Sequence, residues 1–222
     1  PAEGVSRHIT TDRPWLAADP VLAPAGTPLG MDIWQTGAWA LPDPTPLPDE
    51  LERFLAAGEP PLYFGFGSMR AGAETSQTLI AAARALGRRA ILLRGWGQLG
   101  AVDGDDDVIA IGDVSHERLL PRVAAIVHHG GAGTTTAAAR AGRPQVIVPH
   151  LYDQFYWARR VGSLGIGAEG PAAAELTVES LADALRASLA PDLAARAEDL
   201  AGRMESRGAR IAAERLVGLL EG

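Results

Sequence analysis

The residues best suited to chemistry lie in a glycine-rich segment, residues 128–136, with the sequence HHGGAGTTT. An apolar strand is expected over 123–129 and an alanine-rich helix over 134–141. Glycines let backbone amides approach an anion closely, and the first turn of a helix offers unpaired N–H groups and partial positive charge. The segment therefore predicts a phosphate or diphosphate site.

The two histidines of this segment are distinguished by strand geometry, because successive side chains on a strand point to opposite faces. We expect only one to face the ligand, and the position of His129 directly before the glycines favours it. The segment lacks the Gly-Lys-Ser/Thr ending of a triphosphate-binding loop and does not match G-x-G-x-x-G. A structural alternative stays open, in which the glycines only allow close helix–strand packing.

Two other segments follow expected strands and are further candidates. Residues 65–69 read GFGSM, where Ser68 is a hydroxyl donor, although a simple turn is an equal alternative. Asp153 and Gln154 stand side by side at an expected helix start, where a carboxylate and an amide are able to bind vicinal hydroxyls of a sugar. The alternative is that Asp153 only caps the helix.

From Pro48 onward, short apolar runs alternate with longer amphipathic stretches. This alternation predicts an α/β fold, a Rossmann-like parallel sheet with helices on both faces, whose ligands bind beyond the carboxyl ends of the strands. The proline-rich residues 1–48 are expected to be a linker or arm, and residues 49–222 are expected to form the Rossmann-like domain. The expected strands are 62–67, 89–94, 108–112, 123–129 and 145–149, and the expected helices are 49–57, 73–86, 134–141, 153–164, 177–188, 191–205 and 208–220.

Composition excludes several mechanisms. All 20 residues of the Lys+Arg count are arginine, and cysteine is absent, so Schiff-base lysines, thiolate nucleophiles, disulfides and cysteine-bound zinc are excluded. A net charge of −7 disfavours nucleic acid as a partner. The acidic run 103–107 is expected to be a solvated turn, with no metal site. No apolar run is long enough to span a bilayer, and no signal peptide is evident, so a cytoplasmic protein is expected.

The chain resembles the C-terminal half of family 1, GT-B-fold glycosyltransferases, and is most similar to actinobacterial antibiotic enzymes of the vancomycin group. Sterol and macrolide enzymes are more distant. The resemblance rests on GFGSM, on residues 112–161 from GDVSHERLLP to QFYWARRV, and on PWLAADPVLAP and QTGAW nearer the start. It implies a nucleotide-sugar-binding domain of a hexosyltransferase-class enzyme.

The resemblance also implies roles for individual residues. The diphosphate would be bound by Ser68, His129, Gly131, Gly133, Thr134 and Thr135. Asp153 and Gln154 would hold hydroxyls of the donor sugar, and the stretch from Ile111 to Val114 would form a wall around the base.

Two departures from plant members of the family affect the expected nucleotide. Ala137 stands where those enzymes have a ribose-binding Glu, and Ile111 stands where they have a base-stacking Trp. Trp96 is the candidate to stack on the base in its place, and core packing is the alternative role for Trp96. The missing Glu favours a deoxyribose donor such as a dTDP-sugar, with a UDP-sugar as the other option.

The resemblance further implies an inverting transfer to a hydroxyl of a natural-product aglycone, without a metal or other cofactor. The N-terminal half of the family, which holds most of the acceptor site and the catalytic base, has no counterpart here, so the chain alone is expected to be inactive. Two alternatives stay open: a nucleotide-sugar epimerase or mutase, with Asp153 as its acid–base group, and a non-catalytic nucleotide-binding module.

Overall fold

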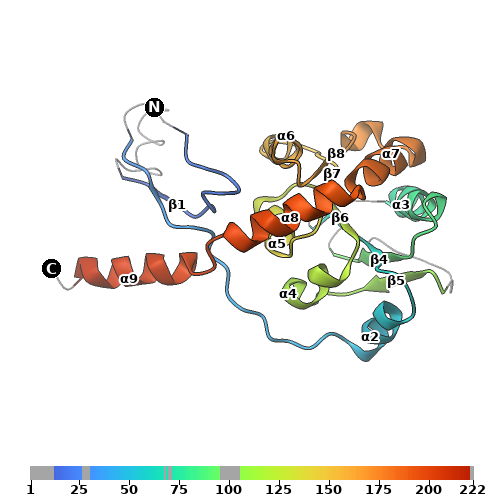
Figure 1. The fold of residues 1–222 in the computed structure, drawn as a ribbon, viewed down its shortest axis with the longest axis horizontal. Coiled ribbons are helices and arrows are strands. Elements are labelled where there is room, and N and C mark those ends of the chain that lie inside the picture. Colours follow the sequence, from blue (N-terminus) through green and yellow to red (C-terminus); the bar gives the residue numbers. More distant parts are fainter. Residues whose placement is uncertain (1–12, 27–30, 68, 70–71, 96–105, 221–222) are drawn as a thin grey trace. The chain divides into compact units, whose positions relative to one another are not determined.

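A computed structural model describes residues 13–26, 31–67, 69, 72–95 and 106–220. They belong to two compact units: residues 43–202 form the larger, and residues up to 42 together with those from 203 onward form the smaller (Figure 1). The sequence-based division at residues 48 and 49 remains a prediction, and the two units are described separately below.

The larger unit contains a six-stranded sheet in which every pair of neighbouring strands is parallel. The strand order is β5-β4-β3-β6-β7-β8. Counted along the chain this is 3-2-1-4-5-6, the order of the dinucleotide-binding fold, and the predicted fold class is confirmed. The strands are β3 (Leu62–Gly65), β4 (Ala90–Leu93), β5 (Val108–Ile111), β6 (Ala125–His128), β7 (Gln145–Ile147) and β8 (Gly167–Glu169).

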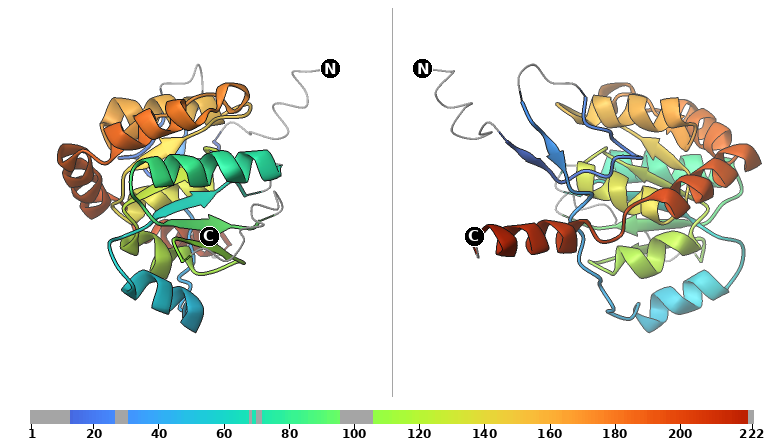
Figure 2. Two further views of the ribbon diagram at one scale, coloured as in Figure 1. Left: turned by 90° about the vertical axis from the view of Figure 1, so that its right-hand side faces the viewer. Right: turned by 60° about the vertical axis from the view of Figure 1, so that its left-hand side comes forward.

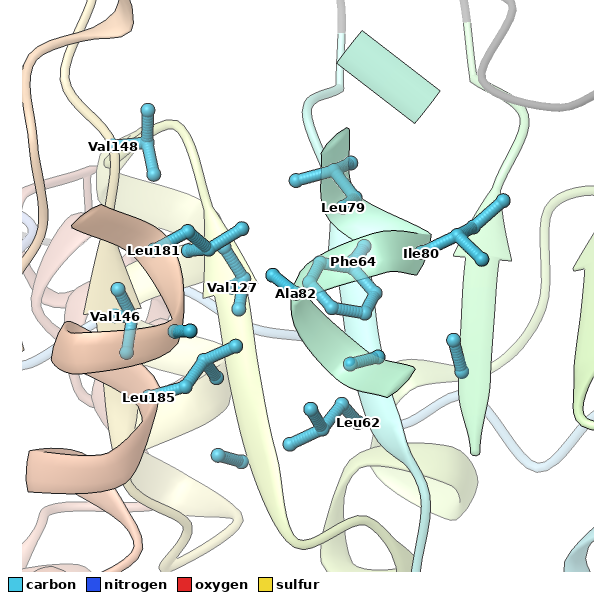
Figure 3. Packing of buried hydrophobic residues seen from close by; sticks show 14 of the residues in the cluster. Leu62, Phe64, Leu79, Ile80, Ala82, Val127, Val146, Val148, Leu181 and Leu185 are labelled. Atoms are coloured by element: carbon cyan, nitrogen blue, oxygen red, sulfur yellow. The ribbon is translucent and has the colours of Figure 1, made fainter. Parts of the chain in front are cut away.

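Helices cover both faces of this sheet (Figure 2). On one face, Leu79 of α3 and Leu181 of α7 pack against Phe64 of β3 and Val127 of β6 (Figure 3). The other face carries a second core that includes residues of α2, α4 and α5. The larger unit contains α2 (Asp49–Ala56), α3 (Ala73–Ala85), α4 (His116–Leu119), α5 (Ala132–Arg140), α6 (Gln154–Leu164), α7 (Val178–Ser188), most of α8 (Pro191–Arg203), and the 3-10 turns η1 (Leu120–Arg122) and η2 (Ala173–Glu175).

Alternation along the strands sorts their side chains between the two cores. Leu62 and Phe64 belong to the first core, whereas Tyr63 between them belongs to the second. The helix α4, the strand β8 and the short turns η1 and η2 of the larger unit were not expected from the sequence. The prediction of β3 was two residues too long at its end, because the strand stops at Gly65.

The smaller unit pairs two short parallel strands, β1 (Trp15–Leu16) and β2 (Trp34–Gln35). The Trp15 and Trp34 rings meet edge to face with centroids 4.8 Å apart. Arg215 of α9 (Gly208–Leu220) places its guanidinium carbon 4.2 Å from the centroid of the Trp34 ring, a cation–π contact. Trp15 and Trp34 of the N-terminal segment are therefore held in a packed arrangement.

Asp19 ties the N-terminal segment of the smaller unit to the residues that precede α9. Its carboxylate is buried and accepts hydrogen bonds from the backbone N–H groups of Val21 at 2.8 Å, Leu22 at 3.2 Å and Glu205 at 2.7 Å. Removal of this buried carboxylate would take away the acceptor of three backbone N–H groups, which costs free energy of folding.

We expect Asp19→Ala to lower the free energy of unfolding of the smaller unit by about 2 kcal/mol. Hydrogen exchange of the Glu205 amide would report the loss directly, because that N–H loses its acceptor. The matched control is Asp32→Ala in the same unit, where the carboxylate is highly exposed and is expected to contribute little. Equal amide protection in Asp19→Ala and the wild type would contradict this role.

Among the described residues, no helix is both long and apolar enough to cross a membrane.

Candidate functional site

The candidate segments lie at the carboxyl edge of the sheet in the larger unit. The loops after β3 and β6 are neighbours because these strands pair with each other, Gly65 lying opposite His128. The strand order reverses between β3 and β6, and parallel α/β sheets bind ligands outside such a switch point. The glycine-rich segment and residues 65–67 are therefore on either side of the expected ligand position.

Helix α5 begins two residues earlier than the sequence predicted, at Ala132 with Gly131 as its N-cap. Neither Gly131 nor Ala132 has the hydroxyl or carboxylate that usually marks a helix start, so this start could not be recognised from the sequence. The Thr135 N–H donates to the Gly131 carbonyl at 2.9 Å, which closes the first turn. The N–H groups of residues 132–134 have no acceptor within the helix and are available to an anion.

The His129 imidazole lies against glycines from two different loops. A Cβ atom placed on Gly131 would be 2.5 Å from His129 Nε2, and one on Gly67 would be 3.1 Å from His129 Cε1. Gly67 also has φ of +57°, a conformation that favours glycine. The ring is therefore held between the end of β3 and the start of α5 by positions that have no side chain.

Burial favours the neutral form of the His129 imidazole. Desolvation lowers the pKa of His129, the nearby His150 lowers it further, and the Gly65 backbone and the Asp153 carboxylate oppose the change. Among the described residues, no group meets hydrogen-bond geometry with the buried Nδ1 of His129. A neutral imidazole carries one N–H donor and one acceptor, and both its polar atoms lie at the switch point.

His128 supports the glycine-rich segment from inside the fold. It is fully buried, its Nδ1 accepts a hydrogen bond from the Gly130 N–H at 3.1 Å, and its Nε2 lies 2.9 Å from Gln145 Oε1. Because Nδ1 accepts, the ring proton is on Nε2 and is donated to Gln145. This leaves His129 as the histidine of the pair that is placed for a ligand.

The burial of His128 predicts a pH-dependent stability. Desolvation lowers its pKa to about 4 in the folded chain, against about 6.5 in the unfolded chain. Between these values the unfolded chain binds more protons, so the free energy of unfolding is lost as the pH falls; from pH 7.5 to 5 we expect this residue to account for about 2 kcal/mol. Urea denaturation at the two pH values measures the loss, and an NMR titration of His128 with a midpoint near 6.5 would contradict the assignment.

The loop after β7 is organised by the Gln154 side chain. Its Oε1 accepts from the backbone N–H groups of His150 at 2.7 Å and Leu151 at 3.1 Å, and its Nε2 lies 3.8 Å from Met69 Sδ. Sulfur is a weak acceptor, so the amide N–H groups retain capacity for a ligand. Gln154 is buried, and its carbonyl oxygen is already committed to the loop.

Asp153 occupies the N-cap position of α6, but its carboxylate makes no capping hydrogen bond. Instead, Asp153 Oδ2 accepts from Trp157 Nε1 at 3.2 Å. The alternative in which Asp153 serves only as a helix cap is therefore wrong. The residue is exposed, and its other carboxylate oxygen is available to a ligand.

Gly130 joins the glycine-rich segment to the loop after β7. It has φ of +91°, and a Cβ atom there would be 2.7 Å from Ile147 Cγ2 and 3.2 Å from both Cβ and the carbonyl oxygen of Gln154. The positive φ and the close approach of Ile147 and Gln154 together favour glycine at this position.

The other predicted site residues differ in their placement. Thr134 is half-buried in the first turn of α5, whereas Thr135 is buried and donates its hydroxyl to the Gly131 carbonyl at 2.9 Å. Thr135 thus has no hydroxyl proton to offer a ligand in this arrangement. Ile111 ends β5 within the second core, and Val114 packs against that core.

Ser68 and Trp96 lie outside the described residues, as do positions 103–105 of the acidic run. In the part of the chain that the structure describes, no group of three or more His, Asp or Glu side chains is placed to hold a metal ion.

Two residues that bear on the site were not singled out from the sequence. Gly67 was visible only as part of GFGSM, and its contact with His129 depends on β3 lying beside β6. His150 directly follows the apolar run that contains β7, and its ring lies edge to face with Phe66 at 5.7 Å between centroids. Its position after a strand, like that of His129, is the signal that could have identified it.

Comparison with known protein families identifies the family of this chain. Residues 98–214, more than half of the chain, match the family described as "Erythromycin biosynthesis protein CIII-like, C-terminal domain". The chain belongs to this family. The resemblance to antibiotic glycosyltransferases is confirmed by two relatives of this chain, both from Amycolatopsis orientalis.

One such relative is glycosyltransferase GtfE, 52% identical over 218 residues, which are 97% of this chain and 52% of the relative. Another is the vancomycin aglycone glucosyltransferase, 50% identical over 219 residues, 98% of this chain and 53% of the relative. The chain thus spans about half the length of the curated relatives it matches.

Solved structures of glycosyltransferases share the fold of this chain. The glycosyltransferase of kitacinnamycin matches with a TM-score of 0.71 at 21% identity, over 93% of this chain and 54% of that one. SnogD from Streptomyces nogalater matches with a TM-score of 0.62 at 25% identity, over 91% of this chain and 54% of that one. The fold is that of one half of a GT-B glycosyltransferase.

Proposed function

We propose that the chain binds the nucleotide-diphosphate-sugar donor, a dTDP- or UDP-sugar, of an inverting glycosyltransferase. The observation that carries the proposal is the position of His129, held between Gly67 and Gly131 at the switch point beside the start of α5. Unpaired N–H groups, the positive end of the helix and a neutral imidazole together suit a diphosphate.

The diphosphate contacts in this proposal come from two loops. The loop after β6 provides the N–H groups of residues 132–134, the Thr134 hydroxyl and His129. The loop after β3 provides Ser68, the donor predicted from the sequence. Thr135 acts indirectly, because its hydroxyl fixes the Gly131 carbonyl. Asp153 and the Gln154 amide are assigned to sugar hydroxyls, and Ile111, Val114 and Trp96 to the base region.

In the proposed transfer, the acceptor hydroxyl oxygen bonds to the anomeric carbon of the sugar while the bond from that carbon to the phosphate oxygen breaks. The acceptor proton passes to a base in the half of the relatives that this chain does not cover. Negative charge develops on the leaving diphosphate, where the α5 amides and His129 stabilise it by preorganised electrostatics. This arrangement requires no metal.

The proposed acceptor is a hydroxyl of a natural-product aglycone. This assignment is supported by the names of relatives, one of which is a vancomycin aglycone glucosyltransferase. Because this chain spans about half of such relatives, we expect it to bind donor without transferring sugar on its own.

Calorimetric titration of the chain with UDP and dTDP tests the proposal. We expect His129→Ala to weaken binding of the preferred nucleotide at least tenfold, about 1.4 kcal/mol. Thr134→Ala is expected to weaken it less. The matched control is Thr136→Ala, because that hydroxyl donates to the Ala132 carbonyl and is not assigned to the ligand. Absence of binding by both nucleotides, or unchanged affinity in His129→Ala, would contradict the proposal.

A further inference from the structure

Tyr152 has a backbone conformation that its side chain does not favour. Its φ is +52°, and it is the one non-glycine residue with positive φ among those the structure describes. Such a conformation in a bulky residue is strained, and strain of this kind is found where a structure holds a residue for a function. Tyr152 is also 88% exposed, so its ring gains little from burial.

The conformation of this loop is imposed by neighbours of Tyr152 and not by its ring. On one side, Gln154 Oε1 accepts from the His150 and Leu151 N–H groups. On the other, the Asp153 carboxylate accepts from Trp157 Nε1. These hydrogen bonds would hold the same loop with glycine at position 152, so the fold supplies no reason for a tyrosine.

Four exposed apolar or aromatic residues lie close together in the sequence around Tyr152, and they are here called the tyrosine patch: Leu151, Tyr152, Phe155 and Tyr156. All four side chains come from the end of one loop and the first turn of α6. Stable protein interfaces bury about 800 Å² on each partner, with about 20 or more residues a side. Four side chains suit a small-molecule ring better than a protein partner.

The position of the patch indicates which ligand it meets. If Asp153 holds the donor sugar, as proposed above, an acceptor oxygen must come within about 3 Å of the anomeric carbon for transfer. The diphosphate side of the sugar is taken by His129 and the start of α5. Tyr152 directly precedes Asp153 and is 88% exposed, so its ring is accessible to a molecule that binds next to the sugar.

We propose that Tyr152 is a specificity-determining residue that contacts the acceptor, with its ring as a platform for an aromatic ring of the acceptor molecule. Aromatic pairs prefer offset-stacked or edge-to-face contact, and a tyrosine keeps its hydroxyl available to water or to a phenol while its face is covered. The inference rests on the proposed function and extends it, because it assigns part of the acceptor contact to this chain.

The test uses the whole chain, saturated with UDP or dTDP, whichever binds, and vancomycin aglycone as a probe rich in phenolic rings. Saturation-transfer NMR measures contact between the chain and the aromatic protons of the probe. We expect a clear signal from the wild type, a signal within twofold in Tyr152→Phe, and at least a threefold loss in Tyr152→Gly. The control is Leu41→Ala, which removes an 86% exposed apolar side chain outside the patch.

Stability and nucleotide affinity separate this role from a structural one. Tyr152→Gly relieves the positive φ, so its unfolding midpoint should equal or exceed that of the wild type, and its nucleotide affinity should be unchanged. An undiminished probe signal in Tyr152→Gly, or no wild-type signal while nucleotide binds, overturns the inference alone. A Tyr152-dependent dimer in sedimentation also overturns it. If neither nucleotide binds the wild type, the proposed function fails and this inference fails with it.

Discussion

Gly167→Ala is expected to destabilise the chain by more than about 3 kcal/mol. Gly167 lies in β8 directly opposite Gln145 of β7. A Cβ atom there would be 2.0 Å from the Gln145 carbonyl oxygen and 2.7 Å from its backbone nitrogen. These neighbours are backbone atoms, so they have no alternative rotamer, and β8 must move away from the sheet.

The damage from Gly167→Ala should extend to the candidate site. Gln145 receives the hydrogen bond of His128, and His128 in turn accepts the Gly130 N–H. The added methyl group also presses on the Gln145 backbone, and a shift of Gln145 would weaken the support of the glycine-rich segment. Loss of nucleotide affinity is expected together with the loss of stability, measured by urea denaturation and calorimetry.

The matched control for Gly167→Ala is Gly162→Ala. Gly162 lies within α6, and a Cβ atom there would meet nothing within 4 Å. Alanine has a higher helix propensity than glycine, so this variant should be more stable by about 0.5–1 kcal/mol. Equal stability of the two variants would show that the close approach of β7 and β8 is not as described.

Gly131→Ala is expected to lower nucleotide affinity about 30-fold, near 2 kcal/mol, while the chain remains folded. The added methyl group would lie 2.5 Å from His129 Nε2. Here the obstacle is a side chain, which is able to rotate, so the fold should survive. The imidazole, however, must leave its position between Gly67 and Gly131 and would no longer face the diphosphate.

Calorimetry with the nucleotide and urea denaturation together measure this effect. Gly72→Ala is the control, because Gly72 is also a helix N-cap and a Cβ atom there would meet nothing within 4 Å. Wild-type affinity in Gly131→Ala would mean that the position of His129 does not matter for binding, and a loss of folding would mean that the ring cannot rotate away.

Most of the sheet could be predicted because each short apolar run, such as those that contain β3 and β6, was recognisable by itself. β8 could not, because Gly167, Ala168 and Glu169 show no apolar pattern, and their pairing with β7 depends on tertiary contact. Helix α4 spans only four residues, too few for a periodic pattern to be detected.

For the candidate site too, features that depend on local sequence could be predicted, whereas contacts between distant residues could not. Strand alternation was enough to separate His128 from His129, which is a local property. The contact between His129 and Gly67 joins residues far apart in sequence and required the strand order. The hydrogen bonds of Asp153 and Gln154 also required coordinates. An aspartate at this position is able either to cap the helix or to accept a hydrogen bond from Trp157, and the sequence is the same in both cases.

The contact of Gly130 with Gln154 bears on how such domains could be recombined. A Cβ atom at position 130 would be 2.7 Å from Ile147 Cγ2 and 3.2 Å from the Gln154 carbonyl oxygen, so this loop fits closely against residues 147–154. A loop taken from another protein is therefore expected to fit only if its partner loop comes with it. Residues 128–154 should therefore be exchanged between relatives as a single cassette. Chimeras that transplant only one of the two loops are expected to misplace both.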